Sequence, residues 1–337
     1  MLRAQAEDFI VDEILSHQPD GQGEHLWVRI EKCHANTEWV ARQLARWAGV
    51  SPRAVSYAGL KDRHALTRQT FSIHLPGKAD PDPQSLDGQG EFRLLTLQRA
   101  ARKLQRGAVT SNRFEITLSN YNGDPDGLEQ RLEAIGRIGV PNYFGEQRFG
   151  HRNLAEADAW LGQGGKAPRS RHRRGLYFSV LRAYLFNQVL ARRVQQDQWC
   201  AVIDGDIVML DGTRSWFVAQ VDEIDQLQQR CAEGDLHPSG PLPGEQASDL
   251  QGQAGALEAA VIEPYQHWVS ALAEQRVKAQ RRALRVIPQQ LNLEYNDRGP
   301  CLSFILPAGC YATVVLREIV DYQVAGQAAG EWEENDE

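Results

Sequence analysis

The stretch YAGLKDRHALTRQ, from Tyr57 to Gln69, is the most informative part of this sequence. It places a single acid, Asp62, in a polar turn together with four basic or imidazole side chains. Residues 56–58 have the composition of a short strand, and apolar residues alternate from Thr70 to Leu75, which is strand periodicity. The turn is therefore predicted to join two strands.

The sequence on either side of this turn predicts a mixture of short strands and helices. His25 to Glu31 and Arg113 to Leu118 both alternate between apolar and polar residues. Between them, Asn36 can cap a helix whose apolar positions recur at helical spacing, and Gly49 can end it. Hairpin-like connections outnumber regular βαβ units, so we expect an α/β (α+β) fold with a mixed, largely antiparallel sheet.

A chain of 337 residues is longer than one hydrophobic core usually supports, so we expect two domains, or one large α/β domain that carries an insertion. From Pro141 the sequence becomes rich in glycine, aromatic and polar residues, and the alternation typical of strands returns after Ala283. We therefore expect a discontinuous catalytic domain at residues 1–138 and 286–325, an inserted α+β domain at 139–285, and an acidic, disordered tail at 326–337. The elements predicted for the insertion are a helix near Ala155 to Leu161, a helix carrying Leu181, Leu185 and Val189, a hairpin at Asp211 and Gly212, a loop from Asp235 to Gly255, and a long helix from Tyr265 to about Arg282.

Charge is distributed unevenly along the chain. The net charge is −7, which is unusual for a nucleic-acid binder, but the terminal EWEENDE supplies five of the acids. Three basic runs lie at residues 99–113, 166–174 and 276–285. Each alone is typical of a solvated surface, yet together they favour a polyanionic partner. The arginines that we expect to contact RNA phosphates are Arg106, Arg113, Arg171, Arg173 and Arg174.

Several function classes lack their signatures. GQGGKA, at Gly162 to Ala167, has neither the spacing of a phosphate-binding loop nor its Ser/Thr, and there is no G-x-G-x-x-G or G-x-S-x-G. The five cysteines are scattered and form no C-x-x-C pair, so their spacing does not indicate a metal site. No apolar run reaches the ~20 residues of a membrane span. The start MLRAQAEDFIVDEIL has no secretory pattern, so a cytoplasmic protein is expected.

Several long motifs in this chain resemble the tRNA pseudouridine synthase D family. They occur in the family's order and leave only the acidic tail outside the likeness. The motifs are DFIVDEI, GEHLWVRIEKCHANT, AGLKDRHALTRQ, VTSNRFEITL, PNYFGEQRFG, RAYLFNQVLARR and LPAGCYATVVLREI.

The resemblance implies an isomerase that converts a uridine of tRNA, at position 13 in the bacterial branch, to pseudouridine. It implies no organic cofactor and no metal, and a circularly permuted pseudouridine synthase-like catalytic domain interrupted by an insertion. We expect tRNA as the partner, no membrane association, and a monomer. The alternative is a non-catalytic RNA-binding or RNA-chaperone protein with the same fold. A carboxylate at position 62 separates the two, because binding alone would not need it.

The resemblance also assigns roles to particular residues. It places the catalytic aspartate at Asp62 and uracil-contacting positions at Asn112, Phe114, Phe9 and Tyr311. Asp62 would act as a nucleophile or as a base that removes a sugar proton. Without the resemblance, Asp62 is typical of a turn residue bonded to its own backbone, the three aromatics of core packing, and Asn112 of a strand entry.

Overall fold

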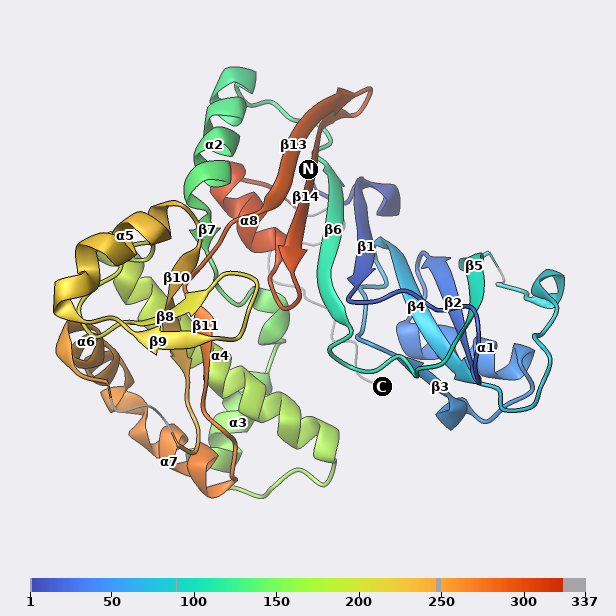
Figure 1. The fold of residues 1–337 in the computed structure, drawn as a ribbon, viewed down its shortest axis with the longest axis horizontal. Helices are drawn as coiled ribbons and strands as arrows, with labels where there is room; N and C mark the ends of the chain where they lie inside the picture. Colours follow the sequence, from blue (N-terminus) through green and yellow to red (C-terminus); the bar gives the residue numbers. More distant parts are fainter. Residues whose placement is uncertain (1, 89, 247–249, 324–337) are drawn as a thin grey trace. The chain divides into compact units, whose positions relative to one another are not determined.

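The computed structural model describes residues 2–88, 90–246 and 250–323, which form two compact units (Figure 1). Unit 1 comprises the chain up to Glu129, Pro288–Gly309 and the segment that starts at Asp321. Unit 2 comprises Gln130–Ile287 and Cys310–Val320. The sequence places residues 310–320 with the catalytic domain, whereas here they group with unit 2. The tail expected at residues 326–337 lies outside the described residues.

Unit 1 is built on an eight-stranded sheet in the order β13-β14-β6-β1-β4-β2-β5, with β3 paired to β4. Strand β1 runs parallel to β4, and the other strand pairs described for this sheet are antiparallel. The predicted mixed, largely antiparallel sheet is thus confirmed. The strands are β1 (Phe9–Leu15), β2 (His25–Lys32), β3 (Val55–Tyr57), β4 (Leu66–His74), β5 (Phe92–Ala100), β6 (Val109–Thr117), β13 (Gln289–Asn296) and β14 (Gly299–Pro307).

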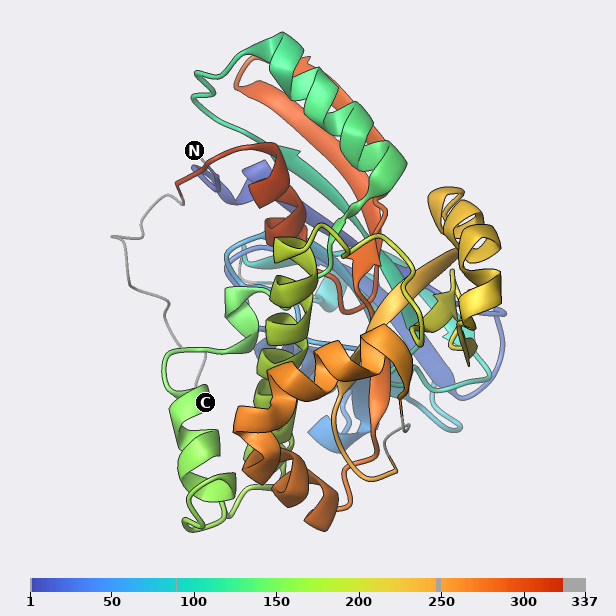
Figure 2. The same cartoon turned by 90° about the vertical axis from the view of Figure 1, so that its left-hand side faces the viewer.

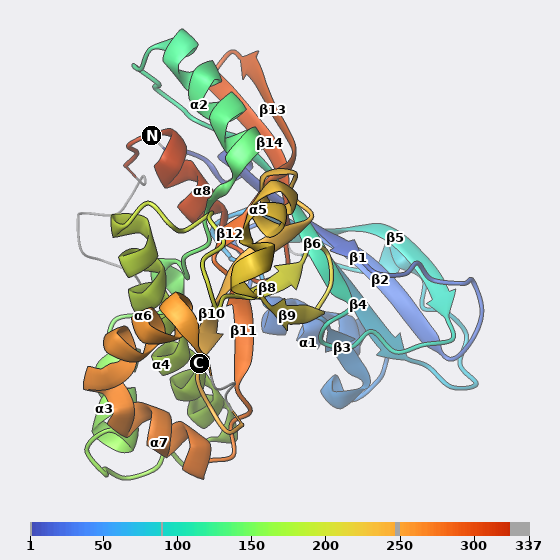
Figure 3. The same cartoon turned by 60° about the vertical axis from the view of Figure 1, so that its left-hand side comes forward.

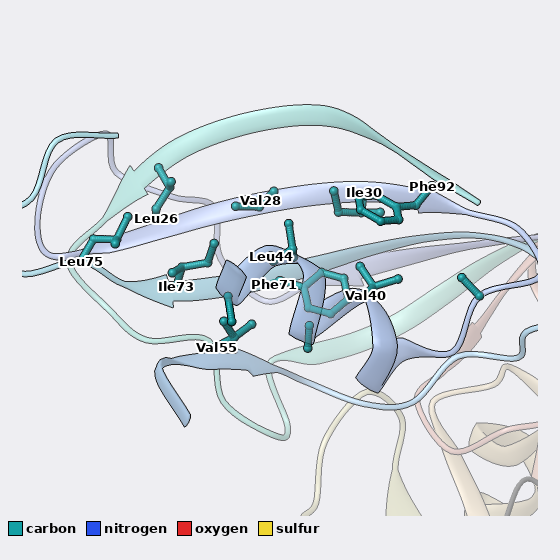
Figure 4. Packing of buried hydrophobic residues seen from close by; sticks show 13 residues of the cluster. Leu26, Val28, Ile30, Val40, Leu44, Val55, Phe71, Ile73, Leu75 and Phe92 are labelled. Carbon is teal, nitrogen blue, oxygen red and sulfur yellow. The ribbon is translucent and has the colours of Figure 1, made fainter. Parts of the chain in front are cut away.

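Helix α1 (Thr37–Trp47) covers one face of β2 and β4. Its Val40 and Leu44 are fully buried and belong to one cluster with Phe71 and Ile73 of β4 (Figure 4). The helix ends as predicted, since Gly49 takes a left-handed φ of 58°. Asn36 occupies the N-cap position, but its side chain makes no capping hydrogen bond. This packing holds β4, and with it the turn that precedes β4.

Unit 2 contains a four-stranded sheet in the order β11-β10-β8-β9 (Figure 3). A two-stranded sheet of β12 and β7 also belongs to this unit. Helix α4 packs against α3 and α7 (Figure 2). The buried residues of this contact include Trp160, Tyr177, Leu181 and Trp268. The strands are β7 (Val140–Pro141), β8 (Ile207–Leu210), β9 (Trp216–Val218), β10 (Leu236–Leu242), β11 (Gln280–Ala283) and β12 (Arg285–Val286). The helices are α3 (Asn153–Leu161), α4 (Arg171–Gln195), α5 (Ile224–Ala232), α6 (Gly252–Ile262), α7 (Gln266–Glu274) and α8 (Ala312–Ile319).

The remaining helices connect these elements. Helix α2 (Pro125–Ile138) crosses the boundary between the units. Short 3₁₀ helices are η1 (Ala6–Asp8), η2 (Pro52–Ala54), η3 (Pro83–Ser85), η4 (Glu146–Arg148), η5 (Val221–Glu223) and η6 (Glu263–Tyr265). Within the part of the chain that the structure describes, no helix is long and apolar enough to cross a membrane.

Two predictions for the insertion were wrong. The expected loop at 235–255 contains β10 and the start of α6. Strand β10 tolerates its prolines because Leu236–Pro238 pairs only with β8 and Ser239–Leu242 only with β11, so each half behaves as an edge. The expected long helix from Tyr265 ends instead at Glu274. Arg276 has a left-handed φ of 55°, which an α-helix cannot continue through, and β11 follows.

Candidate active site

Asp62 lies in the loop between β3 and β4, and both of its carboxylate oxygens are bound. Oδ2 lies 2.8 Å from Nη2 of Arg3, and Oδ1 accepts a hydrogen bond of 2.9 Å from the backbone N–H of His64. The bond to His64 is the local turn contact expected of an ordinary loop aspartate. The ion pair with Arg3 is an additional contact, and it comes from a part of the chain that is remote in sequence. With 29% of its side chain exposed, the carboxylate is both oriented and reachable.

Arg3 is held between this carboxylate and an aromatic ring. Its guanidinium carbon lies 4.4 Å from the centroid of the Phe9 ring, and only 14% of its side chain is exposed. Its backbone has a left-handed φ of 58°, which costs a non-glycine residue on the order of 1–2 kcal/mol. Strain of this kind persists where surrounding contacts enforce it, often at functional sites. Sequence reasoning missed Arg3, although it stands just ahead of the DFIVDEI motif.

The turn that carries Asp62 is held by Lys32 at the end of β2. The Lys32 ammonium donates to the carbonyl oxygens of Ala35 (2.8 Å), Lys61 (3.3 Å) and Asp62 (3.1 Å). Burial lowers the pKa of Lys32 to about 8, and the nearby Asp62 carboxylate partly opposes this. Thr37 of α1 adds a further contact, because its Oγ1 accepts a hydrogen bond of 3.1 Å from the Lys61 N–H.

Asn112 joins the site through Lys61. The Lys61 ammonium donates to Oδ1 of Asn112 and lies 3.6 Å from Oε2 of Glu13. Glu13 in β1 is the register partner of Asn112 in β6. Burial raises the pKa of Glu13 and lowers that of Lys61, and the attraction between the two charges opposes both shifts.

Phe9 and Phe114 are packed in an aromatic row with Phe304 of β14. The Phe9 and Phe114 centroids are 6.2 Å apart in an edge-to-face arrangement, and Phe114 stacks on Phe304 at 5.5 Å with an interplanar angle of 29°. Phe9 and Phe114 are only 4% and 7% exposed. Both rings are therefore buried among neighbouring aromatic side chains. A stacking role toward uracil stays a prediction.

Known proteins resemble this chain over nearly its whole length. A family model described as "tRNA pseudouridine synthase D (TruD)" matches residues 1–157 and 169–319. The chain belongs to the tRNA pseudouridine synthase D family. Two family members named tRNA pseudouridine synthase D match over nearly their full length. The protein from Hydrogenovibrio crunogenus is 44% identical over 327 residues (96% of this chain, 93% of the relative), and that from Pseudomonas putida strain W619 is 46% identical over 331 residues (97% and 93%).

A crystal structure from Methanosarcina mazei that carries the name tRNA pseudouridine synthase D (TruD) has the same fold. Its TM-score is 0.71 at 24% sequence identity, and the match covers 94% of this chain and 92% of that one. The family model skips residues 158–168, which hold the end of α3 and the GQGGKA segment. This segment, dismissed as a phosphate loop from its spacing, thus also lies outside the family match.

The fourth family position expected at the uracil, Tyr311, belongs to unit 2 and precedes α8. Its hydroxyl accepts a hydrogen bond of 3.0 Å from Nε of Arg148, and its ring lies 6.2 Å from that of Phe144. The structure therefore brings Asp62, Phe9, Phe114 and Asn112 together in unit 1 and gives Tyr311 a separate environment in unit 2.

The arginines expected to contact RNA differ in their exposure and in their hydrogen-bond and ion-pair partners. Arg106 and Arg171 are exposed, whereas Arg174 is half-buried. Arg113 donates to Oε1 of Gln290 at 3.0 Å. Arg173 forms an ion pair of 2.8 Å with Glu156 and donates to the Tyr177 hydroxyl, so its charge is largely compensated.

Proposed function

We propose that this member of the tRNA pseudouridine synthase D family isomerises uridine 13 of tRNA to pseudouridine, with Asp62 as the catalytic carboxylate. The observation that carries the assignment is the Asp62 carboxylate itself, oriented by Arg3 and the His64 N–H while still reachable. Family membership supports a tRNA uridine as the substrate, and position 13 follows from the resemblance of the motifs.

We also propose that residues 1–138 and 286–325 act as the catalytic domain and residues 139–285 as an insertion. Asp62, Asn112, Phe9 and Phe114 all lie in the first of these segments and in unit 1.

The reaction is redox-neutral. The bond between sugar C1′ and base N1 breaks, a bond between C1′ and C5 forms, and the C5 hydrogen is replaced by one on N1. The target base must first be extruded from the folded RNA, which costs a few kcal/mol. Aromatic stacking at Phe114 can return about 1–3 kcal/mol and still permit in-plane rotation of the ring. Asp62 would attack the sugar or the base, or remove a sugar proton. The alternative, a non-catalytic RNA-binding protein, does not explain why the Asp62 carboxylate is oriented, because binding alone does not need it.

The test is chemical mapping of pseudouridine in unmodified tRNA transcripts incubated with the wild-type protein and with Asp62→Asn. The variant keeps an oxygen for the His64 N–H but loses the carboxylate, so we expect no product and tRNA affinity within a few-fold of wild type. Asp82→Asn is the matched control, because Asp82 Oδ1 accepts a comparable turn bond of 3.0 Å from the Gln84 N–H. Product from Asp62→Asn at the wild-type rate would refute the catalytic role. Product at another uridine would refute position 13 alone.

A further inference from the structure

Lys61, the residue before Asp62, contacts side chains from two neighbouring strands of the sheet in unit 1. Its ammonium donates to Oδ1 of Asn112 on β6 and lies 3.6 Å from Oε2 of Glu13 on β1. The side chains of Lys61 and Glu13 are only 11% and 1% exposed. The second oxygen of Glu13 accepts a hydrogen bond of 3.1 Å from the Thr70 N–H. Glu13 is therefore fixed by the sheet, and it fixes Lys61.

This contact determines which way the amide of Asn112 faces. The oxygen and nitrogen of an Asn amide can usually be exchanged without a visible change in shape. An ammonium group can only donate, so the group of Asn112 that faces Lys61 must be its oxygen. The amide nitrogen then points the other way. None of the hydrogen bonds found among the described residues uses Nδ2 of Asn112, which leaves its two N–H donors for a ligand.

We propose that Lys61 is a positioning residue that presents Asn112 to the target base as a hydrogen-bond donor for a carbonyl oxygen, and thereby selects uracil over cytosine. The inference rests on the proposed function and adds a specificity determinant to it. Uracil carries carbonyl oxygens at positions 2 and 4, whereas cytosine carries an amino group at position 4. A donor held opposite position 4 pairs with uracil and meets another donor in cytosine, which is costly in a desolvated site.

The same arrangement suits the rotation of the base. Turning the uracil ring in its own plane by two ring positions brings C5 to the former place of N1 and, at the same time, O2 to the former place of O4. A donor that bonds one carbonyl before cleavage therefore meets the other carbonyl after rotation. Asn112 can hold the detached base in both orientations, provided that its nitrogen stays turned toward the base.

The experiment compares single-turnover rates on tRNA transcripts that carry uridine, 2-thiouridine or 4-thiouridine at the target position. Sulfur is a poorer hydrogen-bond acceptor than oxygen, so 4-thiouridine should react at least tenfold more slowly than uridine with the wild-type enzyme. An effect of 2-thiouridine alone would contradict selection at position 4. Lys61→Met should react with uridine about tenfold or more below wild type and should no longer distinguish 4-thiouridine from uridine. Lys61→Arg, which keeps a donor, should restore part of the discrimination.

Asn112→Asp provides a second variant that keeps the side-chain shape and the contact with Lys61. Its carboxylate has no donors, so it should lose the thio effect as Lys61→Met does. Lys61→Met combined with Asn112→Ala should be no slower than Asn112→Ala alone.

Lys78→Met is the control, because the Lys78 ammonium also donates to a carbonyl oxygen (Gly49, 3.1 Å) but is exposed. A thio effect of equal size in wild type, Lys61→Met and Asn112→Asp, or additive losses in the double variant, overturns the inference. Failure of the wild-type protein to form pseudouridine overturns the proposed function instead.

Discussion

The Nη2 atom of Arg3 lies 2.8 Å from the Oδ2 atom of Asp62. The two residues are far apart in the chain, since Arg3 precedes β1 and Asp62 precedes β4. The pairing of β1 with β4 explains the contact, because these strands run parallel, with Ile10 opposite Leu66. Parallel neighbours begin at the same edge of a sheet. The segments that lead into β1 and β4 therefore meet there, and they carry Arg3 and Asp62.

Replacing Arg3 tests whether this contact orients the carboxylate. We expect Arg3→Met to lower the single-turnover rate by roughly 10–100-fold, since small displacements of a reacting group have effects of this size. The free energy of unfolding should fall by only about 1 kcal/mol, because the pair is partly exposed. Arg3→Lys should recover part of the rate, and Arg42→Met on the exposed face of α1 should match wild type. A normal rate in Arg3→Met would leave the ion pair with a structural role only.

Phe114 should matter for both folding and chemistry. Because its ring is 7% exposed and packs between Phe9 and Phe304, Phe114→Ala should cost about 3–5 kcal/mol of unfolding free energy. Phe114→Leu keeps most of the volume, so it isolates the loss of stacking, which we expect to raise the activation free energy by about 1–3 kcal/mol. Phe71→Leu, in the core beneath α1, is the control for stability. Equal rates per folded molecule for the two leucine variants would remove Phe114 from the active site.

Lys32 predicts a dependence of stability on pH. Burial lowers its pKa from 10.5 to about 8. Between these two values the unfolded chain holds a proton that the folded protein has released, so the contribution of Lys32 to stability rises with pH in this window. The rise approaches about 1.4 kcal/mol per pH unit, and below about pH 8 the contribution is flat.

Urea unfolding of wild type and Lys32→Met between pH 7 and pH 9.5 measures this difference. The wild type should gain stability relative to the variant as the pH passes about 8. Lys103→Met, at an exposed position, should track the wild type at every pH. A constant difference between wild type and Lys32→Met would show that the ammonium is not desolvated as the geometry implies.

The basic run at the start of α4 should contribute unequally to tRNA binding. Each phosphate contact adds about 0.7–0.9 to the steepness of a log–log plot of affinity against salt. Arg171 is exposed, so Arg171→Ala should flatten the slope by about that amount if the run faces RNA. Arg173 is already paired with Glu156, so Arg173→Ala should change the slope less. Equal slopes for wild type and both variants would make this run an ordinary solvated surface.

The sequence predicts the parts of the fold in which each strand or helix carries its own pattern. The alternation around β2, β4 and β14, the helical spacing of α1 and the Asp211–Gly212 hairpin are all found in the structure. Strand β10 was missed because two prolines in seven residues indicate a loop, and only its two half-partners make it a strand. The predicted helix after Tyr265 failed for a similar reason, since residues 280–283 become a strand only by pairing with β10.

The sequence also predicts only those residues of the candidate site that lie in local motifs. Asp62, Asn112 and Phe114 were predicted because they lie inside motifs. Arg3 and Lys32 were not, because their importance depends on contacts with a turn that is remote in sequence. A basic residue near a chain start, or at the end of a strand, has no local feature that indicates a catalytic neighbour.

The order of strands in unit 1 also bears on how the chain is made on the ribosome. Strand β6 lies between β1 and β14, yet β14 is synthesised only after the whole of residues 118–298. At ordinary elongation rates this interval lasts roughly 10–40 s. Throughout it the nascent β6 has one unpaired edge, and the face of Phe114 that Phe304 later covers is open to solvent. The charged Arg113 and Glu115 alternate along that strand and discourage its pairing with another chain. The aromatic row of Phe9, Phe114 and Phe304 is thus completed by one of the last strands to leave the ribosome.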